Sequence, residues 1–125
     1  MTPEDRQWLV GILEGEGSFM LSNTSSGTQR VEIRMIDKDI IDRAAKLMRS
    51  KLHPPRFSLG SRHPVYTSVV TGSKARWLMT QMLPYVGSRR RSQIEYSLNY
   101  GPYGYKRQDR KRELSSLSKN TQDIE

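Results

Sequence analysis

The sequence feature that most constrains this chain is the stretch Leu9-Val10-Gly11-Ile12-Leu13-Glu14-Gly15-Glu16-Gly17. Its apolar residues recur at helical spacing, which predicts a helix with one buried face. A glycine inside a helix costs about 1 kcal/mol relative to alanine. Because Gly11 and Gly15 stand four residues apart, they share one side of this helix. We therefore expect something to approach the helix backbone closely along that strip.

Two carboxylates stand where this helix ends. Glu14 and Glu16 are next to the negative end of the helix macrodipole, which disfavours acidic side chains by roughly 0.3–1 kcal/mol. Local rules that are broken together at one point are typical of a functional site. The alternative is a glycine-rich helix end with two solvated glutamates, and the residues alone leave both interpretations open.

At these residues the sequence resembles the LAGLIDADG motif. Leu9, Gly11 and Gly17 match its letters, Glu14 and Glu16 replace its two aspartates, and the family usually continues as here, with Ser18-Phe19. Val10, Ile12 and Leu13 are apolar substitutes, and Gly15 replaces the second alanine. A second stretch, Leu83-Pro84-Tyr85-Val86-Gly87-Ser88-Arg89-Arg90 followed by Gln93-Ile94, is similar to another recurring segment of the family. In that segment a basic residue precedes the last core helix and lies near the metal site.

Composition limits the class of protein and of partner. A chain of 125 residues suffices for one domain with a modest core. It has no cysteine, and its charged first residues are followed by no long apolar run. We therefore expect an intracellular, non-secreted protein without a membrane partner, in a bacterial or phage cytoplasm or in an organelle. The net charge of +8 and the abundance of arginine favour a nucleic-acid partner.

The pattern along the chain predicts an α+β domain. We expect helices over 3–15, 38–51, 74–83 and 89–100, and strands over 18–23, 30–35, 56–59 and 65–70. Thr2, Asp37 and Ser73 are the predicted N-caps of the first three helices, and Trp77 is predicted to be buried. The sheet is antiparallel, with helices on one face. The order αββαββα is that of a LAGLIDADG homing-endonuclease domain, here residues 1–100, with a basic tail over 101–125 that includes a short helix in one interpretation.

The resemblance also implies an activity. LAGLIDADG proteins are DNA endonucleases encoded within introns or inteins, and some act as RNA maturases. Two motif helices pack together in the family, so a chain with one motif is expected to form a homodimer on a palindromic or nearly palindromic duplex. The interface would contain Leu9, Gly11, Ile12 and Gly15, with Glu14, Gly15 and Gly17 supporting the motif.

In that comparison the last acid of the motif, Glu16, binds the divalent metal beside the scissile phosphates. Mg²⁺ fits this role, because it commonly takes one or two carboxylates together with phosphate oxygens, and Mn²⁺ or Ca²⁺ could replace it in binding. No small-molecule substrate is expected. Glutamate in place of aspartate shifts the carboxylate by about a bond length, yet we expect activity to survive.

A basic residue is expected at the active centre. Counting from Pro84 favours Arg89, whereas counting back from Gln93 favours Arg90, and a solvated basic helix start is the alternative. The family also uses a polar residue near the end of its second strand. Arg34, Asp37 and Lys38 are within reach of that position, and the sequence does not choose among them.

DNA contacts are expected mainly from the face of the sheet that carries no helix. There arginine can pair with guanine and glutamate with cytosine in the major groove. The candidate DNA-binding residues are Ser22, Arg30, Glu32, Arg34, Lys38, Arg56, Ser58, Arg62 and Thr67, and Lys74, Arg76 and the run 106–112 are expected to contact phosphates. Two alternatives remain: a DNA- or RNA-binding module without cleavage, such as a maturase or regulator, and a basic dimeric adaptor.

Overall fold

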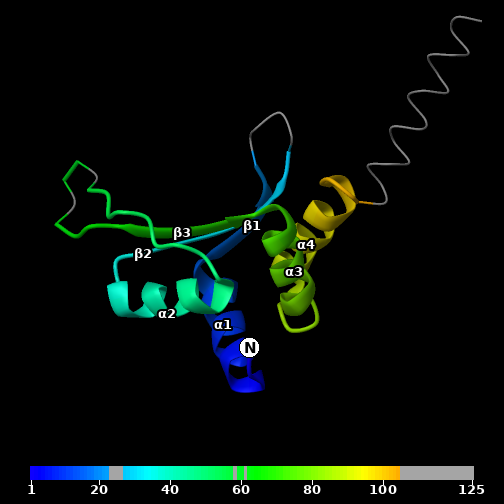
Figure 1. The fold of residues 1–125 in the computed structure, drawn as a ribbon, viewed down its shortest axis with the longest axis horizontal. Helices are drawn as coiled ribbons and strands as arrows, with labels where there is room; N and C mark the ends of the chain where they lie inside the picture. The colour runs from blue at the N-terminus through cyan, green and yellow to red at the C-terminus, as the bar shows by residue number, and fades with distance from the viewer. Residues whose placement is uncertain (23–26, 58, 61, 105–125) are drawn as a thin grey trace, which may run out of the picture.

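The computed structural model describes residues 1–22, 27–57, 59–60 and 62–104 of the chain. In order, these residues form α1 (Pro3–Glu16), β1 (Gly17–Leu21), β2 (Gln29–Met35), α2 (Lys38–Met48), β3 (Tyr66–Thr71), α3 (Gly72–Met82) and α4 (Ser88–Tyr100). The strands form one antiparallel sheet in the order β1-β2-β3. In Figure 1, α1, α2 and α3 lie beneath the sheet and α4 lies at its right-hand end. The α+β class expected from the sequence is confirmed.

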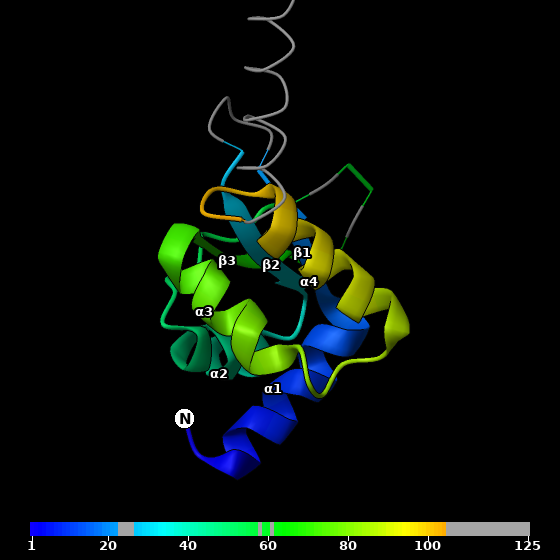
Figure 2. The same cartoon turned by 90° about the vertical axis from the view of Figure 1, so that its right-hand side faces the viewer.

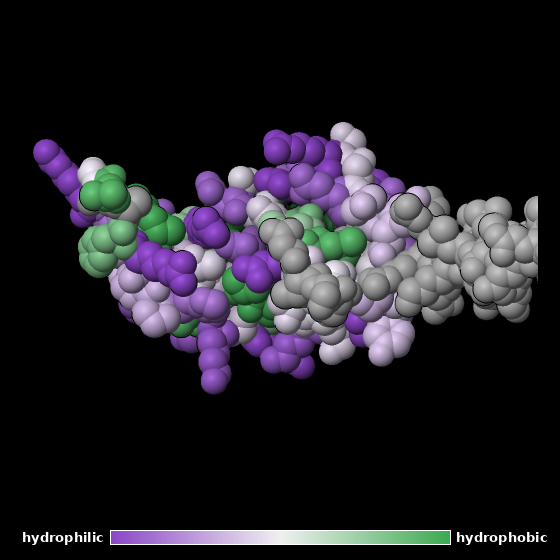
Figure 3. All heavy atoms as spheres, turned by 90° about the horizontal axis from the view of Figure 1, so that it is seen from above, coloured by the Kyte–Doolittle hydropathy of each residue, from purple (hydrophilic) through white to green (hydrophobic). Residues whose placement is uncertain are grey.

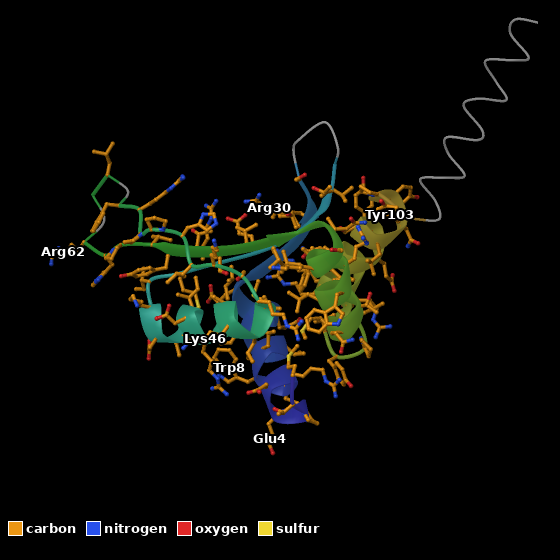
Figure 4. All side chains as sticks on the ribbon, in the orientation of Figure 1. Glu4, Trp8, Arg30, Lys46, Arg62 and Tyr103 are labelled. Carbon is orange, nitrogen blue, oxygen red and sulfur yellow. The ribbon has the colours of Figure 1, made fainter. Side chains whose placement is uncertain are left out.

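Strand alternation divides the sheet into a buried and an open face. Val31 and Ile33 of β2 point into the core and are completely buried. Because successive side chains of a strand point to opposite faces, Arg30, Glu32 and Arg34 occupy the other face, as predicted. Figure 4 shows Arg30 on the upper side of the sheet, opposite to the side on which Trp8 and Lys46 lie.

The core fills the space between the sheet and the helices. α4 packs on β1, α3 on β2 and α2 on β3, while α1 contacts β1, β2 and α2. Leu9, Leu13, Ile41, Leu78 and Ile94 are completely buried in this core, and each such burial stabilises the fold by roughly 1.5–3 kcal/mol. α1 runs obliquely, with its N-terminus far from the sheet and its C-terminus at the sheet (Figures 1 and 2).

The turn from α1 into β1 requires a glycine. Gly17 follows directly on the last helical residue, Glu16, and its N–H bonds to the carbonyl oxygen of Leu13. A Cβ at Gly17 would lie 2.7 Å from that oxygen and 2.9 Å from the Cα of Leu13. Backbone atoms cannot move aside as a side chain can, so the close approach of strand and helix depends on the absent side chain.

α1 and α4 are joined where the first ends and the second begins. The backbone N–H of Gly87, the N-cap of α4, donates to Glu14 Oε2 at 3.1 Å. In return, Arg90 Nε of α4 donates to the backbone carbonyl of Glu14 at 3.0 Å. Glu14 therefore supplies the acceptor that the N-terminus of α4 needs.

The predicted strand at 56–59 is wrong within the described residues. Arg56 pairs with Val65 through an isolated bridge, with N···O distances of 2.9 and 2.8 Å. Pro54 and Pro55 lack the N–H groups that a ladder needs, and Gly60 has a φ of 81° that turns the chain. This segment forms the loop that extends beyond the sheet in Figure 1.

Some helix details also differ from the predictions. α2 ends at Met48 because Arg49 adopts the left-handed conformation, with a φ of 57°. α3 begins at Gly72, and its N-cap is Thr71 instead of Ser73. Trp77 remains 39% exposed, with the guanidinium of Arg49 5.7 Å from its ring centroid.

The first two N-cap positions are confirmed. Thr2 Oγ1 accepts a hydrogen bond from the backbone N–H of Asp5 at 3.1 Å, and Asp37 occupies the cap position of α2 without a side-chain bond to the helix. None of the described helices is both long and apolar enough to cross a membrane. The predicted basic tail lies, from residue 105 onward, outside the described residues.

Replacing Gly17 with alanine should destabilise the fold by about 1–3 kcal/mol, because the new Cβ overlaps the backbone of Leu13. The matched control is Gly15→Ala, since a Cβ at Gly15 meets nothing within 4 Å. We expect that control to be as stable as the original chain or more so. Urea unfolding at low protein concentration measures both variants. Equal midpoints for the two would contradict the steric account of Gly17.

Removing the Glu14 side chain should weaken the attachment of α4. In Glu14→Ala the N–H of Gly87 loses its acceptor, so we expect a loss of about 1 kcal/mol in the free energy of unfolding. Glu14→Gln keeps an oxygen at that place and should lose less. Thermal or urea unfolding compares the two variants with the original chain. If all three are equally stable, the hydrogen bond between Gly87 and Glu14 contributes nothing to the free energy of unfolding.

Candidate nucleic-acid interface

The last residue of α1 lies at the border of the open sheet face. Glu16 is exposed, and it lines a hollow of about 330 Å³ with Ser18, Met20, Glu32 and Arg34. Sequence analysis missed Ser18 and Met20, although the alternation of β1 places them on the same face as Glu32. The carboxylate of Glu16 therefore opens onto the surface that carries the basic residues of β2.

Two of the three candidates for the strand-borne polar residue lie near Glu16. A second hollow of about 300 Å³ is lined by Glu16, Arg34 and Asp37, among others. Lys38 instead extends along α2, where its Nζ lies 2.9 Å from Asp42 Oδ2. Of the three candidates, Arg34 lines both of these hollows beside Glu16, and Asp37 lines one of them.

The two candidate arginines of α4 have different environments. Arg90 is half-buried, and besides its bond to the carbonyl of Glu14 it donates from Nη1 to Gln93 Oε1 at 3.1 Å. Arg89 is exposed. The structure thus brings Arg90 to the end of α1, two residues before Glu16, and a cation there complements the negative end of the helix.

A carboxylate and two guanidiniums form a cluster at the centre of the open face. Glu32 Oε2 accepts from Arg30 Nε and Nη2 at 3.3 and 3.2 Å, and Glu32 Oε1 accepts from Arg34 Nε at 2.6 Å. Burial alone would raise the pKa of Glu32, but the hydrogen bonds and positive charges of Arg34 and Arg30 outweigh it and hold the pKa below its ordinary value of 4.5. Glu32 is only 8% exposed, and both its carboxylate oxygens already accept hydrogen bonds from arginine, so its direct pairing with cytosine stays a prediction.

A third and larger hollow on this face is amphipathic. It has a volume of about 470 Å³ and is lined by basic, aromatic and aliphatic side chains: Arg30, Glu32, Arg34, His53, Pro54, Arg56, Phe57, Val65, Thr67 and Val69. The predicted DNA contacts Arg56 and Thr67 line this hollow together with Arg30, Glu32 and Arg34 of β2. Figure 3 shows the face as mostly hydrophilic, with smaller hydrophobic areas. Sequence analysis missed His53 and Phe57, because no periodicity marks a loop residue that folds over a sheet.

Other predicted DNA contacts are dispersed. Arg62 is at the far end of the loop that follows Arg56 (Figure 4). Ser22 lies at the end of β1, where its Oγ is 3.1 Å from Thr28 Oγ1. Lys74 and Arg76 belong to α3, in the helical layer: Lys74 Nζ donates to the carbonyl of Arg49 at 3.2 Å and Arg76 lies over the ring of Tyr103. Ser58 lies outside the described residues.

The predicted interface strip is only partly available on α1. Gly11 and Gly15 are exposed, and a Cβ at either would meet nothing within 4 Å. Ile12 is half-buried against the core. Leu9 is completely buried in the hydrophobic core of its own chain. Its assignment to a dimer interface is therefore corrected.

No protein-family model and no curated protein matches the sequence. The fold, in contrast, is similar to solved structures of DNA-bound homing endonucleases. The archaeal intron-encoded enzyme I-Vdi141I complexed with DNA gives a TM-score of 0.55 at 14% identity, over 74% of this chain and 64% of the other. I-CvuI in complex with its target, in the presence of 2 mM Ca, gives 0.56 at 12% identity, over 77% and 67%.

A LAGLIDADG meganuclease, I-CpaMI bound to uncleaved DNA, has a TM-score of 0.52 at 16% identity. The match covers 74% of this chain but 34% of the meganuclease, and less than two thirds of I-Vdi141I is covered. Apart from the strand expected at 56–59, the order of helices and strands, the antiparallel sheet and the similarity to these structures agree with one another. The chain has the LAGLIDADG homing-endonuclease fold.

Proposed function

We propose that this chain is a homodimeric, site-specific DNA endonuclease that uses a divalent metal to hydrolyse both strands of a long palindromic or nearly palindromic target. The observation that carries the proposal is the position of Glu16. Its exposed carboxylate ends the motif helix and opens onto the sheet face that bears Arg30, Arg34 and Arg56. A protein that only binds DNA gains nothing from a free carboxylate directed at phosphates.

The donor set fits a hard divalent cation. In the described part of the chain, no three side chains of the metal-ligating types gather in one place. Two copies of Glu16 meeting near a twofold axis would repel each other unless a cation lies between them. Carboxylate and phosphate oxygens are ligands that Mg²⁺ prefers. When bound, such an ion activates a water and stabilises the departing oxygen.

The other residues of the site hold and orient the substrate. Arg90 is fixed by Glu14 and Gln93, so its guanidinium is held near the end of α1 and can contact a phosphate there. Arg34, which lines both hollows beside Glu16, can contact the DNA from the strand. Arginine binds phosphate in a planar, bidentate manner but does not act as a base, so we assign both a binding role.

The exposed strip on α1 supports the homodimer in this proposal. The open strip at Gly11 and Gly15 permits a second α1 helix to approach, and a twofold axis there would bring both Glu16 carboxylates to one duplex. DNA as the partner is supported by the neighbours in fold, whose structures are complexes with DNA.

Glu16→Gln should abolish cleavage but leave DNA binding unchanged within a few fold, because the substitution removes the ligand charge and keeps the shape. The measurement is cleavage of sequences selected from a random duplex library with Mg²⁺, beside binding of the same duplexes. The matched control is Glu95→Gln, an exposed glutamate in the middle of α4. Binding without cleavage by the original chain would select a binding module, and no salt-dependent binding would select an adaptor.

Gly11→Leu should weaken the dimer by roughly tenfold or more in its dissociation constant, because overpacking an interface costs about 1–3 kcal/mol. The fold of the single chain should be as stable as before, since a Cβ at Gly11 has free space around it. Sedimentation measures the dimer, and urea unfolding measures the fold. Thr80→Leu, at an exposed position of α3, is the control. An unchanged dimer in Gly11→Leu would exclude this strip as the interface.

A further inference from the structure

We propose that Glu32 is a positioning residue that holds Arg30 and Arg34 as a paired reader of two neighbouring guanines in each half of the DNA target. This inference rests on the proposed function, because it requires a duplex on the open sheet face. It goes beyond that function in assigning a sequence preference to three residues of β2.

The first argument is that Glu32 occupies only some of the N–H donors of each guanidinium. Arg30 bonds to Glu32 through Nε and Nη2, and Arg34 bonds to it through Nε. In both arginines the carboxylate therefore occupies the Nε side. The outer edge, with its Nη hydrogens, stays available, and this edge forms the bidentate pair with O6 and N7 of guanine.

The second argument is that the arginines remain accessible while the carboxylate does not. The side chain of Glu32 is 10% exposed, whereas those of Arg30 and Arg34 are 33% and 69% exposed. The cluster therefore presents guanidinium groups, and not the acid, to a ligand. Fixing a long side chain before binding also reduces the conformational entropy lost when a base is contacted.

The third argument is distance. Arg30 and Arg34 stand four residues apart on one strand, so their Cα atoms are separated by about 13 Å. Because both side chains bond to the two oxygens of one carboxylate, at 2.6–3.3 Å, their guanidiniums converge between these positions. Base pairs follow each other every 3.4 Å or so. The pair should therefore read adjacent or next-but-one base pairs, and not positions about four apart.

The fourth argument is the cost of this acid. A carboxylate at the centre of a face that meets phosphates reduces attraction for any duplex, whatever its sequence. Its burial is also unfavourable without partners. The arrangement gains discrimination in return, because arginines that are bound to Glu32 are less free to turn toward phosphates.

The test compares the original chain, Glu32→Gln and the control Glu95→Gln. Bound duplexes are selected from a random library, and affinities for the selected site and for a scrambled duplex are titrated against salt. We expect the original chain and the control to select two guanines in adjacent or next-but-one positions of each half-site. In Glu32→Gln the preference for both should fall roughly tenfold. Binding to the scrambled duplex should tighten at low salt, with a steeper dependence on salt.

The outcomes distinguish a failure of this inference from a failure of the proposed function. If the original chain binds and cleaves a defined site, but Glu32→Gln keeps the full preference for both guanines, only this inference is overturned. Selected guanines about four positions apart would overturn it as well, and so would a uniform loss of affinity with an unchanged preference. If the original chain shows no salt-dependent binding to any duplex, the proposed function falls and this inference with it.

A second pair of variants tests the inference if Glu32→Gln does not fold. Arg30→Lys and Arg34→Lys keep the positive charge but lose the planar edge. Each should lose the preference for one of the two neighbouring guanines, while affinity for the scrambled duplex stays within about twofold, because the charge that meets phosphates is retained. An unchanged selected sequence in both variants would overturn the proposal.

Discussion

The geometry of this chain depends on the meeting of two helix ends of opposite polarity. The last carbonyls of α1 and the first N–H groups of α4 lack partners within their own helices. Arg90 donates to the carbonyl of Glu14, and the side chain of Glu14 accepts from Gly87. Each end thus receives the charge that its dipole favours. Because β1 starts directly after Glu16, this contact between α1 and α4 also fixes the position of the Glu16 carboxylate relative to the sheet.

If the open face binds DNA, as we propose, its charges must do more than attract a polyanion. Uniform positive charge gives strong binding to every duplex, whereas discrimination comes from base edges. In this chain Glu32 divides the basic surface at its centre, and the arginines beside it are held by hydrogen bonds. Arg62, in contrast, lies at the end of its loop, far from Arg30.

The sequence predicted the parts of the fold that local patterns determine. The helical spacing around Leu9 and Leu13 and the alternation of β2 both led to correct elements and correct buried faces. The loop after Pro54 was wrongly predicted as a strand, because the alternation of Phe57 and Leu59 with polar residues gives the same signal whether or not a partner strand exists. Arg89 and Arg90 could not be distinguished, since adjacent residues differ only in the three-dimensional contacts that follow from helix packing. The hydrogen bonds that Glu32 accepts from both arginines could not be predicted either, because alternation gives the face of a residue but not its partners.

The two glutamates of the motif region have different roles, and the difference follows from reach. Glu14 needs its full length to bring Oε2 within 3.1 Å of the N–H of Gly87, and an aspartate would be one methylene shorter. Gly87 in turn has no side chain, and a Cβ there would lie 2.8 Å from Glu14 Oε1. The long acid and the glycine are therefore mutually compatible in a way that changing either alone would disturb. Glu14 is accounted for by the fold, and the exposed Glu16 is the carboxylate to which the proposed function assigns chemistry.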